Sequence, residues 1–138
     1  MKKLLVIICM LFSVTAFAQF ETSKYRMEHM AIRVGEPDET DFGEWEDVNI
    51  LVVIDGEQKT VKCFNKDLTS YYMVAFGSET KELVDKDGDV YGTVIFEAID
   101  YKNRSCWVKF QEWENLNIFQ LYVYYDAWTF VYEGFKLD

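Results

Sequence analysis

The sequence between residues 90 and 135 reads VYGTVIFEAI (90–99), DYKNR (100–104), SCWVKFQEW (105–113), ENL (114–116), NIFQLYVYY (117–125), DA (126–127) and WTFVYEGF (128–135). The four longer runs are rich in β-branched and aromatic residues, and hydrophobic residues alternate with polar ones within them. The short runs between them contain Asp or Asn, which are typical of turns. This pattern predicts four consecutive β-strands joined by hairpins.

The turn lengths determine which residues lie opposite one another. A turn at 101–103 places Phe96 opposite Val108, and a loop at 114–117 places Val108 opposite Val123. A slip of one residue would move every side chain to the other face, so the agreement of four strands predicts an antiparallel meander with one apolar face. The residues expected on this face are Val94, Phe96, Ala98, Cys106, Val108, Phe110, Phe119, Leu121, Val123, Tyr125, Trp128, Phe130 and Tyr132, joined near a strand end by Glu112.

The rest of the chain extends the same pattern. A hairpin between 46–54 and 60–65 places Val52 opposite Cys63, and two further strands are predicted at 22–34 and 70–76. We therefore expect an all-β fold of about eight strands in sequential order. Such a meander closes most naturally into a small, lipocalin-like up-and-down barrel, because closure removes the sheet edges. A two-sheet sandwich is the alternative.

The N-terminus has the pattern of an export signal. Two lysines follow Met1, an apolar run covers 4–12, and Ala16-Phe17-Ala18 matches the A-x-A cleavage pattern. We predict a signal peptide at 1–18 and a single domain at 19–138. The apolar run is too short for a stable membrane anchor. The compact basic start is typical of bacteria, so the expected location is the periplasm or the exterior.

The charge balance excludes several classes of partner. The 138 residues include 24 acidic and 14 basic ones, for a formal net charge of −10, which becomes −12 without Lys2 and Lys3. This charge argues against nucleic acid and against anionic membranes as partners. His29 is the single histidine, which argues against a His-based metal site and against a histidine general base. We expect His29 to be a half-buried polar residue.

Two cysteines, Cys63 and Cys106, remain after removal of Cys9 with the signal peptide. In an oxidising compartment an even pair favours a disulfide. Two separate buried thiols are the alternative, since free Cys is among the most buried residue types. Geometry decides between them.

Two short motifs resemble known families. Gly43-Glu44-Trp45 resembles the G-x-W motif near the first barrel strand of lipocalins, and no lipocalin binding residue is transferred from it. The export signal, the segment EDVNILVVID (46–55) and the Cys-containing strand at 105–110 are similar to small exported all-β proteins of bacteria to which no function is assigned. This resemblance implies a location and a fold class, and no chemistry.

The opposite face of the meander carries the candidate binding site. Rings there alternate with amide and charged side chains, a composition suited to a protein or glycan partner or, if covered by another segment, to ordinary core. The candidate residues are Tyr91, Trp107, Trp113, Tyr122 and Tyr124. We predict a non-catalytic binding or interaction module that uses this aromatic face and needs no cofactor.

Three other functions are weaker alternatives. The barrel interior could carry a small ligand, although its large inward residues favour a filled interior. Glu112 also points inward, but its place near a strand end favours a solvated position on the rim. The run Asp85–Asp89 begins like an EF-hand loop, but Val90 and Phe96 break the motif, so a turn is expected. The acidic residues between 36 and 47 are expected to form a solvated loop. A carboxylate-based hydrolase is the least expected function, because no catalytic motif is present.

Overall fold

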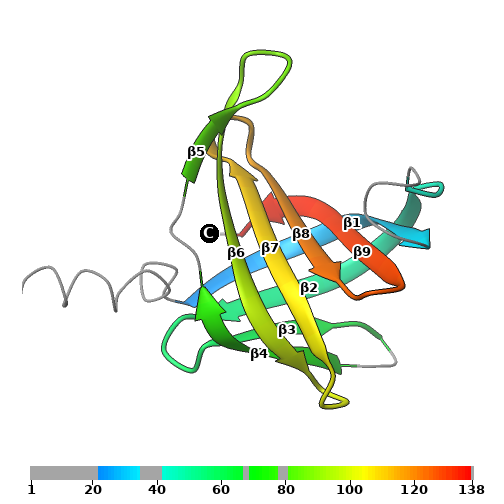
Figure 1. Ribbon diagram of the computed structural model, residues 1–138. Helices are drawn as coiled ribbons and strands as arrows, with labels where there is room; N and C mark the ends of the chain where they lie inside the picture. Colours follow the sequence, from blue (N-terminus) through cyan, green and yellow to red (C-terminus); the bar gives the residue numbers. More distant parts are fainter. Residues whose placement is uncertain (1–21, 35–41, 67–68, 78–80, 138) are drawn as a thin grey trace, which may run out of the picture.

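The computed structural model describes residues 22–34, 42–66, 69–77 and 81–137. They form nine antiparallel strands and a short 3-10 helix, η2 (Figure 1). The elements are β1 (Thr22–Val34), β2 (Glu46–Asp55), β3 (Thr60–Phe64), β4 (Thr69–Gly77), β5 (Lys81–Val84), β6 (Val90–Asp100), β7 (Ser105–Trp113), η2 (Glu114–Leu116), β8 (Ile118–Tyr124) and β9 (Trp128–Lys136). The predicted signal peptide and residues 36–41 of the acidic run predicted between 36 and 47 lie outside the described residues.

Eight of the strands form a closed barrel. Neighbours along the chain pair from β1 to β4 and from β6 to β9, and the pairings β1–β9 and β4–β6 close the ring (Figure 1). The up-and-down barrel is therefore confirmed, and the sandwich does not form because these two pairings join what would have been its edges. β5 pairs with the first residues of β6, on the side of β6 where β4 pairs with its later residues. The sequence did not predict β5, since all four of its residues are exposed and show no alternation.

The predicted registers are confirmed. Phe96 pairs with Val108, and Val108 with Val123. Val52 pairs with Cys63 in the earlier hairpin. The apolar face of the meander therefore points into the barrel, where it meets the inward residues of β1, β2 and β3.

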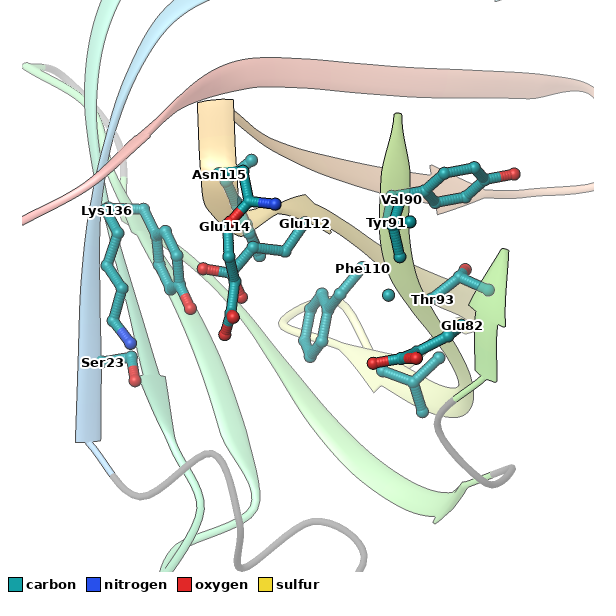
Figure 2. Close-up of a pocket in the computed structure, with 14 residues that line it drawn as sticks. Ser23, Glu82, Val90, Tyr91, Thr93, Phe110, Glu112, Glu114, Asn115 and Lys136 are labelled. Atoms are coloured by element: carbon teal, nitrogen blue, oxygen red, sulfur yellow. The ribbon is translucent and has the colours of Figure 1, made fainter. Parts of the chain in front are cut away.

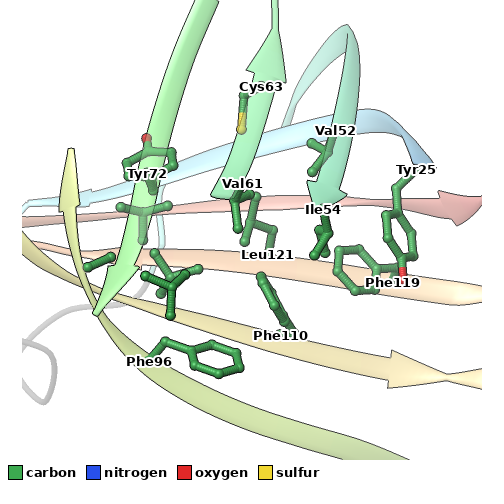
Figure 3. Packing of buried hydrophobic residues seen from close by; sticks show 14 of the residues in the cluster. Tyr25, Val52, Ile54, Val61, Cys63, Tyr72, Phe96, Phe110, Phe119 and Leu121 are labelled. Atoms are coloured by element: carbon green, nitrogen blue, oxygen red, sulfur yellow. The ribbon is translucent and has the colours of Figure 1, made fainter. Parts of the chain in front are cut away.

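The middle of the barrel is filled by hydrophobic side chains (Figure 3). Phe96 and Phe119 are 1% exposed, and Leu121 and Val108 are fully buried. Burying a side chain of this size contributes about 1.5–3 kcal/mol. The predicted filling of the interior thus holds for its central layers.

The two cysteines are separate buried thiols. Cys63 lies on β3 and Cys106 on β7, with β4 and β6 between them in the sheet order. A disulfide needs Cα atoms within about 7 Å, and two cysteines that are three strand spacings apart around the barrel wall do not meet this condition. The disulfide interpretation is therefore wrong for this structure, and burial raises the pKa of Cys63 to about 12 and that of Cys106 to about 11.

A bulge in β1 shifts the register against both neighbouring strands between Met27 and His29. Gly134 on β9 lies opposite this bulge, and a Cβ atom there would overlap the backbone carbonyl of Arg26. The close approach of two backbones requires glycine at this position. Because of the shift, His29 is exposed beside Asp47, with its Nδ1 atom 3.3 Å from the Asp47 carboxylate, instead of half-buried as the sequence predicted.

Candidate functional site

The five aromatic residues of the predicted binding face lie outside the barrel on β6, β7 and β8. The register pairs Trp107 with Tyr124 and places Tyr122 beside Lys109. Trp107 is 44% exposed, whereas Tyr91, Trp113, Tyr122 and Tyr124 are half-buried. Four of the five rings form two stacked pairs, and each pair also contacts other side chains of the protein.

The first pair consists of Tyr91 and Trp113, whose ring centroids are 4.7 Å apart. The Trp113 Nε1–H group donates a hydrogen bond of 2.9 Å to the Asp85 carboxylate. This contact ties the turn between β5 and β6 to the end of β7. The polar atom of Trp113 is therefore used within the protein.

The second pair consists of Tyr122 and Tyr124, which stack at 5.8 Å with an interplanar angle of 6°. The Lys109 ammonium lies over both rings, 4.3 Å from the Tyr122 centroid and 5.3 Å from that of Tyr124. Burial, with the nearby charge of Arg33, lowers the pKa of Lys109. Burial, with the neighbouring Tyr122, raises the pKa of Tyr124 to about 12.

The side chains of Phe42 and Arg33 cover part of this face. The Phe42 ring contacts Tyr122 at 6.2 Å, and the Arg33 guanidinium stacks 4.6 Å above Phe42. Arg33 also donates to the Thr129 hydroxyl at 3.3 Å. Beneath this layer, Val131 and Thr129 are buried although they point out of the barrel. Part of the face is thus ordinary core, and its role as a partner surface stays a prediction.

A cavity of about 420 Å³ lies at the end of the barrel where β1, β6 and β8 begin (Figure 2). We term it the Glu112 cavity; its main lining residues are Tyr25, Phe110, Glu112, Glu114, Phe119 and Lys136. Tyr25 stacks on Phe119 with 3.8 Å between the ring centroids, and Phe110 is 5.9 Å from Phe119. These rings make an aromatic floor, since they also belong to the packed core below.

The rim of the Glu112 cavity is polar. Figure 2 shows Glu112 and Glu114 pointing into the cavity between Lys136 and Phe110, with Glu82 of β5 on another side. Burial raises the pKa of Glu112, Lys136 opposes this rise, and Glu114 adds to it. Burial and the Glu112 charge also raise the pKa of the Tyr25 hydroxyl. Three carboxylates and one ammonium thus surround an apolar floor.

Small residues explain why this end is hollow while the middle is filled. Val94 and Phe96 point inward, so the alternation along β6 also places Gly92 inward, where it has no side chain to contribute. On β1, Ser23 occupies the inward position before Tyr25. The sequence correctly placed Glu112 inward opposite Phe119. It missed Ser23, Lys136 and Tyr25, because their position beside Glu112 depends on the β1–β9 closure.

The other acidic motif forms a turn. The Asp85 carboxylate accepts the backbone N–H groups of Asp87 and Asp89, and Gly88 has a positive φ of 85°. These bonds lower the pKa of Asp85, the largest cause being the bond from Asp89. In the described ranges no group of three or more His, Cys, Asp or Glu side chains is arranged to hold a metal ion. The turn predicted at Asp85–Asp89 is confirmed.

No family model, curated protein or solved structure matches this chain. The lipocalin-like motif also differs in its setting: Gly43-Glu44-Trp45 precedes the second strand instead of the first, and Trp45 is 48% exposed. Of the helices that the described residues form, none has the length and hydrophobicity needed to cross a membrane. Function is therefore inferred from the cavities and surfaces themselves.

Proposed function

We propose that this chain is an exported, non-catalytic binding protein that holds a small molecule in the Glu112 cavity. The observation that carries the proposal is the open space of about 420 Å³ above an aromatic floor, in a barrel whose central layers are packed. Ligand pockets of small proteins are commonly of this size and combine apolar walls with a few polar groups. Export rests on the N-terminal sequence pattern.

The lining indicates the chemistry of the ligand. Glu112 and Glu114 face this space from one side, and Val90, which is 48% exposed, offers apolar surface to the body of a ligand. Phe110 and Phe119 lie beneath as a floor that is almost fully covered, at 2% and 1% exposed. A cationic head fits these carboxylates better than an anionic one, and aromatic rings also attract cations. We therefore expect a small organic ammonium compound, with a neutral hydroxyl analogue binding more weakly.

A series of three probes with the same ring and different charge tests the proposal. Benzylammonium, benzyl alcohol and benzoate would be titrated into the isotopically labelled protein, with the backbone amide of Gly92 as the reporter signal for this cavity. We expect saturable shifts with affinity falling in that order. Equal shifts with all three probes, or none with benzylammonium, would refute the proposal.

A cavity-filling variant supplies the matched control. Gly92→Leu places a side chain in the cavity at a strand position that does not have a positive φ, and we expect it to abolish benzylammonium binding. Gln111→Leu adds similar hydrophobic bulk to the outer face of the adjacent strand and should leave binding unchanged. Unfolding midpoints of both variants would show that the fold is retained.

The outer aromatic face is a second candidate, favoured by the exposure of Trp107 beside the stacked Tyr122–Tyr124 pair. A glycan or protein partner would use Trp107 as an anchor. Trp107→Ala should then abolish capture of a glycan-array ligand or partner with an unchanged unfolding midpoint. Trp113→Ala should instead reduce stability, because Trp113 is bonded to Asp85.

A further inference from the structure

A second cavity, of about 230 Å³, lies at the opposite end of the barrel, where β2, β4 and β9 begin and β3, β6 and β8 end. We term it the Arg104 cavity; its polar lining consists of Asn65, Ser70, Tyr101, Arg104, Tyr125 and Trp128. Ile50, Phe130 and Tyr132 add apolar surface. The Glu112 cavity and the Arg104 cavity therefore occupy the two ends of one barrel.

Among the described residues that line the Arg104 cavity, Arg104 carries the one formal charge, and it is paired with the buried Asp100 beside the cavity. None of these described lining residues is acidic, although acidic residues outnumber basic ones by 24 to 14 in the sequence. The nearby Asp100 is buried and its oxygens are occupied: it accepts the backbone N–H groups of Lys102 and Arg104, the Arg104 Nε–H and the Tyr125 hydroxyl. An incoming anion would meet cationic and donor groups.

The Arg104 guanidinium is held in place before any ligand arrives. Its Nε atom lies 2.9 Å from the Asp100 carboxylate, and its Cζ atom lies 5.1 Å from the centroid of the Tyr125 ring and 5.9 Å from that of Trp128. In the part of the chain that the structure describes, the terminal nitrogens of Arg104 make no hydrogen bond. A guanidinium fixed through Nε still presents N–H donors in the planar arrangement that matches a carboxylate.

Trp128 adds an unused donor to the same cavity. Its Nε1–H group is buried and has no hydrogen-bond acceptor among the described residues. Burying a donor without an acceptor is unfavourable, so such groups are normally satisfied by protein, water or ligand. The Tyr125 hydroxyl donates its one proton to Asp100, so it has none left to donate to a ligand in this cavity.

We propose that the Arg104 cavity binds a small organic carboxylate, whose oxygens accept hydrogen bonds from the Arg104 guanidinium and the Trp128 indole while its apolar body lies along Phe130 and Tyr132. A charged acceptor satisfies the fixed guanidinium and the buried N–H together, which a neutral ligand does less well. The site is separate from the Glu112 cavity and does not depend on the function proposed for it.

The indole N–H signals of the protein give a direct readout. Benzoate is the probe, benzyl alcohol is its uncharged analogue, and Trp128→Phe assigns the Trp128 signal in the nitrogen–proton spectrum. We expect benzoate to move the Trp128 signal downfield in a saturable manner, because the N–H gains an acceptor, whereas benzyl alcohol leaves it nearly unchanged. The Trp113 signal is an internal control, since that N–H is already bonded to Asp85.

Two variants separate recognition by Arg104 from a general effect of charge. Arg104→Gln should weaken benzoate binding at least about tenfold, while Lys102→Gln, which removes a positive charge from an exposed position of the same turn, should change it less than about twofold. Trp128→Phe keeps a ring but loses the donor, and we expect a loss of about fivefold, measured by calorimetry.

Three results would overturn the proposal: no saturable shift of the Trp128 signal with benzoate, an equal shift with benzyl alcohol, or unchanged binding in Arg104→Gln. The first would mean that the cavity holds water only. The unfolding midpoint and the remaining spectrum of Arg104→Gln establish that the variant is folded. Should it unfold, Trp128→Phe provides the independent test, because it leaves the Asp100–Arg104 pair intact.

Discussion

The two turns at the ends of β6 have the same backbone design and different surroundings. Each begins with an aspartate, Asp85 or Asp100, whose carboxylate accepts the N–H groups two and four residues later. Each has a positive φ three residues after that aspartate, at Gly88 or Asn103. Asp85 is only half-buried, whereas Asp100 is 3% exposed.

The same type of turn therefore has a different role at each end of the barrel. The second carboxylate oxygen of Asp85 accepts the Trp113 indole and ties down an outer hairpin. The corresponding oxygen of Asp100 accepts both Tyr125 and Arg104, and so fixes the donors around the Arg104 cavity. Burial alone would raise the pKa of Asp100, but the hydrogen bonds from Tyr125, Arg104 and Lys102 outweigh it and hold the pKa below its usual value.

The largest expected effect comes from Asp100→Ala. The substitution leaves two backbone N–H groups, the Arg104 Nε–H and the Tyr125 hydroxyl without their acceptor, and we expect a loss of about 3–5 kcal/mol in the free energy of unfolding. Urea denaturation followed by tryptophan fluorescence measures it. Asp85→Ala removes the same backbone contacts from the more exposed turn and should cost clearly less; equal losses at the two turns would contradict the comparison.

The next largest loss of stability is expected from Gly134→Ala, which adds one methyl group where β9 pairs with β1. The added Cβ overlaps the Arg26 carbonyl opposite the bulge in β1, so the two strands must separate, at a cost of about 2–3 kcal/mol. Thermal and urea unfolding would measure the loss. Gly43→Ala is the milder comparison, because its added Cβ would lie 3.2 Å from the Ile32 carbonyl, a tight contact that a shift of a few tenths of an ångström relieves. Equal stability of the two variants would show that the seam opens at little cost.

These positions also show what the sequence could and could not predict. The register of β6 to β9 followed from alternation and turn length, because a slip would have exposed Phe110 or Val123. The bulge between Met27 and His29 could not be predicted, since the strand pattern of β1 reads equally well without it. The feature of the sequence that points to the bulge is Gly134 on the neighbouring strand.

The cavities depend on closure of the ring and were therefore less predictable. Glu112 was correctly placed inward, but Lys136 and Ser23 reach it only through the β1–β9 pairing. The polar residues of the Arg104 cavity come from three separated parts of the chain, at the connections β3–β4, β6–β7 and β8–β9. Alternation assigns a side chain to a face, and it does not show which residues of distant strands meet at one end of a barrel.

The buried thiols give the next prediction and concern the Arg104 end, since Cys63 lines that cavity. With pKa values raised to about 12 for Cys63 and about 11 for Cys106, both are protonated at pH 8 and react slowly. We expect native-state alkylation to be at least about a hundredfold slower than that of the urea-unfolded chain. Without prior reduction, mass spectrometry of the unfolded chain should find both residues alkylated; unmodified Cys63 and Cys106 would instead indicate the disulfide.

The smallest expected effect tests the electrostatics of the Glu112 cavity. The folded-state pKa of Glu112 is raised, so the folded protein binds its proton more tightly than the unfolded chain does. The linkage relation then requires that the free energy of unfolding contributed by Glu112 decreases as the pH rises from about 4, the ordinary carboxyl range, through the raised pKa. Glu112→Gln removes this penalty and should stabilise the protein at pH 7 by less than about 1 kcal/mol, since solvent screens the half-exposed group.

The pH dependence distinguishes this electrostatic effect from a change in packing. Near pH 3.5, where the wild-type carboxyl is protonated, the stability difference between wild type and Glu112→Gln should vanish, whereas a packing effect would persist. Glu114→Gln is the comparison variant: Glu114 is exposed on the same rim and is the smallest of the causes that act on the Glu112 pKa, so its removal should shift the curve less than Glu112→Gln does. If Glu112→Gln were instead less stable than wild type at pH 7, the attraction between Glu112 and Lys136 would outweigh the cost of burying the carboxylate. The Lys136 ammonium would then occupy the place that we propose for the cationic head of a ligand.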